Sequence, residues 1–292
     1  MVYLLMSIKE KYCGLLGPNG SGKSTTINCL LSLLNFNKGS IKIFGKEMSP
    51  NSSDIKSKIG VVFQDVAVFD ELTVYDNINY FCGLYVKNKD TRKQYVEEAI
   101  ELVGLNDFKK FYPKKLSGGL LRRLNIACVI AHKPSLIFLD EPTVAVDPQS
   151  RNNILEGIKK LNSMGATIIY TTHYMEEVED LCSRIIIIDK GKIIAQGTNE
   201  ELKELVSTGE KVRIELSELD NKYIEEMKRS DDIHDINYDG KTLYITYKKG
   251  QYNLGNLIDY LKENKIEYNK IFSELPSLND VFLELTGTEL RD

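Results

Sequence analysis

The chain has 292 residues, of which 42% are hydrophobic and 27% charged, with a formal net charge of −4. This composition is typical of a folded protein that buries a real core, in one large domain or two ordinary ones. The negative charge argues against a nucleic-acid partner, because nucleic-acid-binding proteins usually carry a basic excess. No apolar run approaches the roughly 18 residues that cross a bilayer, so any role at a membrane is expected to come through a partner.

The cysteines and the first residues narrow the class further. The five cysteines are odd in number, widely scattered and lack C-x-x-C spacing, which indicates free thiols rather than a disulfide framework or a zinc site. The opening MVYLLMSI is apolar but lacks a basic leader and a cleavage site, so we do not expect a signal peptide.

The first predicted elements are a short strand at residues 13–16 and a helix with an apolar face from Ile27 to Leu34. The segment between them fits G-x-x-x-x-G-K-[ST] and consists of Gly17, Pro18, Asn19, Gly20, Ser21, Gly22, Lys23 and Ser24. Glycines let backbone N–H groups wrap a phosphate, and a helix N-terminus adds its positive dipole end. Lys23 is expected to reach the β- and γ-phosphates, and the Ser24 hydroxyl to bind Mg²⁺. The pattern therefore predicts a site for a nucleoside triphosphate.

The next predicted strand, residues 59–63, ends at a polar residue, Gln64. Helical periodicity follows at residues 74–86, 92–103 and 120–131. We therefore predict a mostly helical lobe, over about residues 65–130, inserted into a sheet domain.

Two further predicted strands carry polar residues at their ends. Leu136 to Leu139 are apolar and are followed by Asp140 and Glu141, of which the first can hold Mg²⁺ and the second can orient an attacking water. The strand at 167–171 leads to His173, after a helix at 153–163, and a further strand is expected at 185–188. Buried strands that alternate with helices predict a largely parallel sheet, which binds ligands at the carboxyl ends of its strands.

After about residue 210 the pattern changes. Val212, Ile214 and Leu216 alternate as in a half-buried strand, as do Leu243, Ile245 and Tyr247, and helices are expected at 222–228 and 256–264. Residues 211–292 carry 12 basic and 17 acidic side chains. We predict two domains, residues 1–210 and 211–292, the second being a small α+β domain.

The stretch from Lys115 to Arg123 reads KLSGGLLRR, and it places Ser117, Gly118 and Gly119 ahead of a helix. Exposed N–H groups at a helix N-terminus form an anion site, although an ordinary helix cap is the default explanation of Ser-Gly-Gly when it stands alone.

Taken in order, the phosphate-binding loop, Gln64, LSGG, LIFLDEPT and His173 resemble the ATP-binding subunit of ATP-binding-cassette (ABC) transporters over nearly the whole chain. The segment PSLNDVFLELTG is similar to the C-terminal domain of the drug-exporter branch, the daunorubicin-resistance type. The resemblance implies an α/β fold: a P-loop NTPase sheet domain of the ABC-ATPase kind with an inserted helical lobe, plus a small C-terminal α+β domain.

The resemblance also implies an ATPase that needs ATP and Mg²⁺ and powers a separately encoded membrane permease, at the cytoplasmic face of the cell membrane. The exported compound would be a drug, a lipid-like compound or another small molecule. Two copies, or one copy and a homologous ATPase subunit, would pair head to tail with two ATP molecules between them.

The family pattern assigns roles to the motif residues. The phosphate loop from Gly17 to Thr25 would bind one ATP, and the partner's Leu116, Ser117, Gly118 and Gly119 would cover its γ-phosphate. Ser24, Gln64 and Asp140 would hold Mg²⁺, and Gln64 would also sense the membrane partner. Glu141 would activate water, His173 would contact the γ-phosphate, and Asp147 would lie across the dimer seam.

The chain departs from the family pattern at three places. Leu120 stands where many members have glutamine, and Ala145 stands where glycine is usual. If position 145 requires a positive φ, alanine costs on the order of 1 kcal/mol. The aromatic residue that stacks on adenine normally lies further upstream than this chain extends, so Tyr3 and Tyr12 are the nearby candidates. A terminal position for Tyr3 and core packing for Tyr12 explain each of them more simply.

These departures leave two alternatives open. One is a binding-only or degenerate subunit with little turnover, for which Ala145 and the short segment before the phosphate loop are the reasons. The other is a soluble ABC protein that acts on ribosomes or DNA. It predicts an inserted coiled coil, tandem cassettes or a basic face, and the sequence has none of these.

Overall fold

The structure is a computed structural model, and it describes residues 12–206, 208–250 and 253–287. The chain divides into two compact units, Met1–Asn199 with Leu290–Asp292, and Glu200–Glu289. We placed the second domain from residue 211, but the strand β9 (Thr208–Leu216) already begins three residues earlier. Its start carries Gly209 and Glu210, which break the apolar alternation that identified the strand in the sequence.

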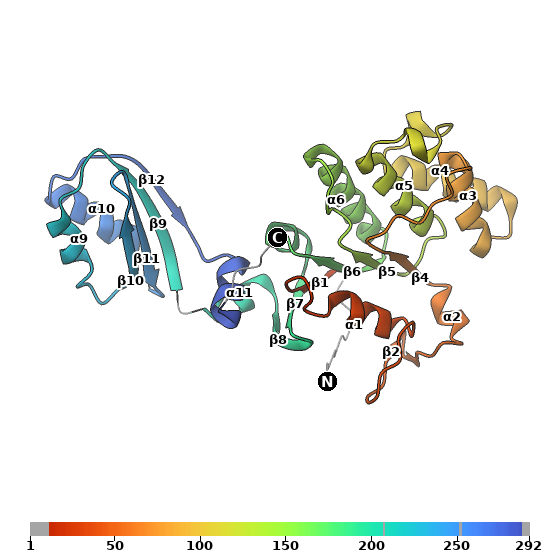
Figure 1. Ribbon diagram of the computed structural model, residues 1–292, viewed down its shortest axis with the longest axis horizontal. Helices are drawn as coiled ribbons and strands as arrows, with labels where there is room; N and C mark the ends of the chain where they lie inside the picture. Colours follow the sequence, from red (N-terminus) through yellow and green to blue (C-terminus); the bar gives the residue numbers. More distant parts are fainter. Residues whose placement is uncertain (1–11, 207, 251–252, 288–292) are drawn as a thin grey trace. The chain divides into compact units, whose positions relative to one another are not determined.

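Within residues 12–206, six strands form one sheet that runs across the first unit (Figure 1). Their order is β4 (Ile59–Val62), β5 (Leu136–Asp140), β6 (Thr167–Thr172), β1 (Tyr12–Leu16), β7 (Arg184–Asp189) and β8 (Lys192–Gly197). All neighbours pair in parallel except β7 and β8. The parallel strands are buried on both faces, which is why they appear in the sequence as continuous apolar runs.

The register of this sheet brings the ends of four strands to one edge. Leu16 at the end of β1 pairs with Thr172 at the end of β6. Asp140, which ends β5, pairs with Thr171, and Val62 of β4 pairs with Leu139. The residues that follow these strands therefore emerge at the same edge.

Helices cover both faces of the sheet. Figure 1 shows α1 (Lys23–Leu30) and α6 (Pro148–Ser163) on opposite sides. Ile27 of α1 is fully buried and packs in one cluster with Phe138 and Ile169 of the sheet. The helix α7 (Met175–Leu181) lies against β1, where Gly14 leaves room for Val178. The hairpin of β2 (Lys42–Ile43) and β3 (Lys46–Glu47) and the short helix α2 (Ser53–Lys56) lie between α1 and β4 in the chain.

The predicted helical lobe consists of α3 (Val74–Tyr85), α4 (Lys89–Leu102) and α5 (Gly118–Ile130), which pack on one another. Two 3₁₀ turns, Asn106–Phe108 and Pro113–Lys115, connect α4 to α5. We placed the second helix from residue 92, but its N-cap is Asn88, whose side chain accepts a hydrogen bond from Thr91 N. The polar residues of this first turn carry no apolar period, so the pattern missed it.

The second unit begins with α8 (Asn199–Lys203) and contains a βαββαβ motif. After β9 come α9 (Asn221–Met227), β10 (Ile233–Tyr238), β11 (Thr242–Lys248), α10 (Asn253–Glu263) and β12 (Tyr268–Glu274), then α11 (Leu278–Thr286). In the described residues its sheet has the order β10-β11-β9-β12, and all pairs are antiparallel.

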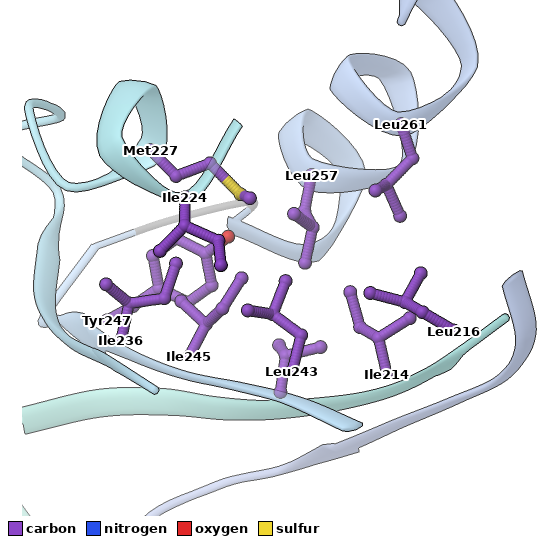
Figure 2. Packing of buried hydrophobic residues seen from close by; sticks show 11 residues of the cluster. Ile214, Leu216, Ile224, Met227, Ile236, Leu243, Ile245, Tyr247, Leu257 and Leu261 are labelled. Carbon is purple, nitrogen blue, oxygen red and sulfur yellow. The ribbon is translucent and has the colours of Figure 1, made fainter. Parts of the chain in front are cut away.

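One face of this second sheet forms a core with α9 and α10. Figure 2 shows Ile214, Leu243 and Ile245 pointing from the strands toward the two helices. From the helices, Ile224, Met227, Leu257 and Leu261 pack against them. The predicted strands and helices of this unit are present. The strands β10 and β12 were missed, because half of the side chains of β10 and most of those of β12 are exposed and give no apolar alternation.

Among the helices of the described ranges, none is both long and apolar enough to cross a membrane.

Candidate functional site

The loop between β1 and α1 has an open main-chain surface. Gly20 and Gly22 have φ of 80° and 105°, a left-handed conformation that residues with a Cβ rarely adopt. Gly22 caps α1 without a side-chain hydrogen bond, and the first turn holds no acidic residue. The first N–H groups of α1 are therefore available to an anion.

Two buried polar atoms at this edge make no hydrogen bond within the described residues. Ser21 is 2% exposed, and its Oγ has no hydrogen-bond partner among the described residues. The Nδ1 atom of His173, at the end of β6, is in the same condition. A buried polar atom without a partner costs about 1–3 kcal/mol, so these atoms mark a place where a polar ligand fits.

Lys23 connects the loop to the acidic end of β5. Its side chain is buried, and Nζ donates to Gly17 O at 2.8 Å and to Pro18 O at 3.3 Å. The same atom lies 3.3 Å from Oε1 of Glu141. Oε2 of Glu141 lies 3.7 Å from Nδ1 of His173. The structure thus brings together Lys23 at the start of α1, Glu141 after β5 and His173 after β6.

Glu141 occupies a strained backbone position at the end of β5, with a φ of +47°. Its N–H is shared between Thr171 O at 3.1 Å and Thr171 Oγ1 at 3.0 Å. Non-glycine residues in the left-handed region cost energy and cluster at functional sites. Thr171 therefore holds Glu141 in a conformation that directs its carboxylate toward Lys23.

The predicted metal ligands all offer oxygen atoms. Asp140 is 4% exposed and accepts a hydrogen bond from Thr171 Oγ1 at 2.6 Å through one carboxylate oxygen, Oδ1. Ser24 and Gln64 are exposed on the first turn of α1 and after β4. In the described part of the chain no group of three or more His, Cys, Asp or Glu side chains could hold a metal ion. The oxygen atoms of Asp140, Ser24 and Gln64 nevertheless suit Mg²⁺, because this ion binds through one or two protein oxygens while phosphates and waters complete its shell.

The Leu116–Gly119 motif lies at the start of α5. Ser117 is the N-cap, and its Oγ accepts from Leu120 N at 3.3 Å. Gly118 is exposed, with open space around it. Gly119 is buried, and a Cβ there would lie 2.2 Å from Ser150 Oγ and 2.9 Å from Asp147 Oδ2.

Glycine at position 119 thus lets α5 approach the start of α6. Asp147 is the exposed N-cap of α6 and accepts from Ser150 N, which lowers the pKa of its carboxyl. The structure therefore places the Ser-Gly-Gly motif beside Asp147 of the same chain.

A buried carboxylate, Glu177, was not identified from the sequence. Its Oε2 accepts from Tyr170 OH at 2.7 Å, from Thr172 Oγ1 at 2.9 Å and from Thr143 Oγ1 at 3.0 Å. Arg151 of α6 lies 3.5 Å from its other oxygen. Burial and the charge of Glu177 raise the pKa of Tyr170 well above its usual range, so the phenol stays a donor. The signal was an acid at position 177 beside the apolar residues Val178 and Leu181, where a surface helix would bury only apolar side chains.

Tyr3 and Tyr12 were the two candidates for stacking on adenine. Tyr3 lies outside the described residues. Tyr12 donates from its hydroxyl to Ile158 O of α6 at 3.1 Å, and burial, with the nearby Cys182, Asp180 and Glu156, raises its pKa to about 12. The Tyr12 side chain therefore points to α6 and packs there, which agrees with the expected core packing.

Ala145 has a φ of +57°. Position 145 therefore requires a positive φ, and alanine adopts this left-handed conformation in the turn that precedes Asp147.

Comparison with known proteins gives the family. The model of the ABC transporter family matches residues 6–144, and that of the C-terminal domain of DrrA1-3-like ATP-binding proteins matches residues 197–286. The linearmycin resistance ATP-binding protein LnrL of Bacillus subtilis (strain 168) is 37% identical over 97% of this chain and 92% of its own. The chain belongs to the ABC transporter family, as an ATP-binding subunit.

Other relatives are of the same kind. The daunorubicin/doxorubicin resistance ATP-binding protein DrrA of Streptomyces peucetius is 34% identical over 96% of this chain and 85% of its own. The Nod factor export ATP-binding protein I of Cupriavidus metallidurans is 32% identical over 96% of this chain and 89% of its own.

Among solved structures, a dimeric ATP-binding cassette in a post-hydrolysis state, bound to ADP and Pi, is similar. It is 28% identical, with a TM-score of 0.60 over 66% of this ABC subunit and 88% of the cassette. This ABC subunit is therefore an ATPase of the drug-resistance and export type, and the predicted family, fold class and ATPase activity are confirmed.

Proposed function

We propose that this ABC subunit hydrolyses ATP to power a separately encoded permease that exports a small molecule. One observation supports this most strongly. The register of the parallel sheet brings the phosphate loop, Asp140, Glu141 and His173 to a single edge, with the charged atoms of Lys23 and Glu141 3.3 Å apart.

In this proposal the open N–H groups of residues 17–25 wrap the phosphates, and Lys23 neutralises the β- and γ-oxygens. Ser21 Oγ and His173 Nδ1, which make no hydrogen bond within the described residues, would form hydrogen bonds with the nucleotide. The γ-phosphate then replaces Glu141 as the partner of Lys23. The carboxylate of Glu141 is thereby free to accept a proton from the attacking water.

Magnesium fits the same edge. Ser24 and Asp140 would hold it, with Gln64 as a further oxygen ligand, and its chemistry is to neutralise charge that develops on the β- and γ-phosphate oxygens. Thr171, which holds one oxygen of Asp140, would leave the second carboxylate oxygen for the ion.

The second half of the site would come from another copy or a homologous subunit. Ser117 and Gly118 are exposed at a helix N-terminus, and the exposed Asp147 lies beside the next residue, Gly119. An anion site that faces outward is complete only when the γ-phosphate held by another subunit fills it, so ATP would join the two subunits and hydrolysis would separate them.

A permease would dock on the helical lobe. Phe69 and Tyr80 are 42% and 48% exposed, and their rings meet edge to face at 5.0 Å. Phe63 and Val66, on either side of Gln64, are also exposed. Exposed apolar patches of this kind mark interaction sites, and this one adjoins a proposed metal ligand. Relatives are named for resistance to linearmycin and to daunorubicin and doxorubicin, and for export of Nod factor, which supports export of a drug or lipid-like small molecule.

Gentle extraction from membranes tests the partner. We expect the tagged full chain to co-purify with a multi-spanning protein and to hydrolyse ATP in the presence of Mg²⁺. The left-handed Ala145 favours a second candidate, a binding-only subunit, which ATP would stabilise against heat without turnover. Recovery only as a free monomer would contradict the exporter proposal.

A further inference from the structure

Arg122 is a charged side chain in the interior of the first unit. It lies on α5 and is only 4% exposed. A guanidinium carries five N–H donors in a rigid plane. In the described structure, five main-chain carbonyl oxygens accept from this one group: Phe63 and Gln64 from Nη1 at 2.7 and 2.8 Å, Pro142 from Nε at 2.9 Å, and Asp140 and Glu141 from Nη2 at 3.1 and 3.0 Å.

The acceptors belong to two loops that carry site residues. The strands β4 and β5 pair as far as Val62 and Leu139, and beyond this point the two chains no longer pair with each other, although Asp140 still pairs with Thr171 of β6. Phe63 and Gln64 continue one strand, and Asp140 to Pro142 continue the other. Buried carbonyl groups that lose their ladder partners must find other donors, and Arg122 supplies them.

The acceptors are carbonyl groups rather than carboxylates, so the buried charge is balanced by dipoles. Burial lowers the pKa of Arg122, and the negative charges of Asp140, Asp65 and Glu141 oppose this. A guanidinium with every donor satisfied tolerates such a place, whereas an ammonium presents its three donors from a single atom and cannot span two loops.

Asn125, one turn further along α5, adds a second tie. It is 3% exposed, and its Oδ1 accepts from Ala67 N at 3.1 Å. The segment after β4 is therefore held to α5 at Gln64 and again at Ala67. Only Arg122 also reaches the loop after β5.

We propose that Arg122 is a positioning residue for ATP hydrolysis, which fixes the main chains of Gln64 and Glu141 to the helix that begins with the Ser-Gly-Gly motif. The three segments then move as one body when α5 moves. The proposal rests on the role of Glu141 proposed above. Because Glu141 is held at a φ of +47°, loss of the carbonyl tie lets its backbone relax and displaces its carboxylate.

The test compares Arg122→Lys with Arg123→Lys in the full chain. Arg123 is the matched control, because its Nη1 donates to Val103 O at 3.1 Å and Gly104 O at 3.3 Å, at the end of α4. For Arg122→Lys we expect kcat to fall by about tenfold or more, with KM for ATP changed less than about twofold, since a small misplacement of a reacting group is this costly. Arg123→Lys should retain kcat.

Backbone hydrogen exchange gives a readout that does not depend on turnover. In Arg122→Lys, peptides that cover residues 63–68 and residues 140–146 should both exchange faster. Asn125→Ala should speed exchange in the first segment alone, and Arg122→Gln, which avoids a buried ammonium, serves as a second variant if Arg122→Lys does not fold. Unchanged exchange in the second segment of Arg122→Lys, or parent-like kcat, overturns the proposal. An equal loss of kcat and nucleotide binding in Arg122→Lys would also overturn it, as a general folding defect.

The test also separates this proposal from the proposed function. Absence of a permease partner would contradict the exporter proposal, while faster exchange of both segments would still support the tie through Arg122.

Discussion

The ammonium group of Lys23 and the carboxylate of Glu141 form a buried ion pair, with Nζ 3.3 Å from Oε1. Lys23 begins the helix that follows β1 and Glu141 follows β5, and the strand β6 lies between β1 and β5 in the sheet. The group expected to activate water thus contacts the group expected to bind phosphate. ATP offers Lys23 a better partner, so binding and release of Glu141 are expected to be one event.

Glu141→Gln is the first prediction. The amide keeps the shape of the side chain but cannot accept a proton, so kcat should fall by about 10² or more, as is typical for loss of a general base. ATP binding should remain, because the phosphate loop is unchanged. Both are measured on the purified chain, by phosphate release and by the ATP-dependent shift of the unfolding temperature. Size-exclusion chromatography should also show a dimer that persists in ATP.

Glu176→Gln is the control for this variant. Glu176 is an exposed acid in the first turn of α7, and its removal changes the same charge without touching the site. A Glu141→Gln protein that hydrolyses ATP like the parent would show that Glu141 does not activate water.

Much of this site could be predicted from the sequence, because each motif follows a buried parallel strand. Asp140, Glu141 and His173 emerge at the predicted edge for that reason alone. The contacts between loops could not be predicted in this way. Whether Arg122 faces solvent or the interior depends on how α5 lies against the sheet, and no local pattern records that.

The second unit shows the same limit. Val212, Ile214 and Leu216 alternate because one face of β9 covers a core, and so the strand was predicted. The strand β12 forms the edge beside β9 with mostly exposed side chains. Its place is decided by pairing with β9, a long-range contact that its own sequence does not encode.

Ala145→Gly is expected to stabilise the protein. Alanine at a φ of +57° costs about 1–2 kcal/mol, and glycine removes this cost. Glycine loses more backbone entropy on folding, however, which costs about 0.5–1 kcal/mol. The free energy of unfolding in urea should therefore rise by roughly 0.5–1 kcal/mol. Ala131→Gly is the control, since Ala131 is right-handed at the end of α5 and should lose stability on the same change.

Turnover of Ala145→Gly separates the two readings of this position. If the turn before Asp147 limits hydrolysis, the variant should hydrolyse ATP faster than the parent. A more stable protein with unchanged kcat would show that the strain is without effect on the reaction.

Glu177→Gln should destabilise the first unit by about 2 kcal/mol. One carboxylate oxygen accepts from three hydroxyl groups, of Thr143, Tyr170 and Thr172. An amide can retain that oxygen, but its NH₂ group then faces the guanidinium of Arg151, which leaves buried donors without acceptors. Urea unfolding measures the loss. The exposed Glu176→Gln should change the free energy by less than about 0.5 kcal/mol, and an equal effect of the two variants would contradict the importance of this network.

Asp280→Asn should make stability less dependent on pH. Burial raises the pKa of the Asp280 carboxyl, but hydrogen bonds from Lys211 and from Ser277 outweigh it, so the pKa lies below its ordinary value of 3.8. A lowered carboxyl pKa means that the stabilisation is fully present above pH 3.8 and is lost as the pH falls through the folded-state pKa. The capping box at the start of α11 also depends on this charge. At pH 7 the variant should therefore be less stable by about 1 kcal/mol, and the difference should close below pH 3.8.

Urea unfolding at several pH values measures both, with Asp259→Asn as the control, because Asp259 is exposed and its pair with Lys262 spans 4.0 Å. A difference between parent and Asp280→Asn that persists unchanged at pH 3 would show that the charge of Asp280 is not its source.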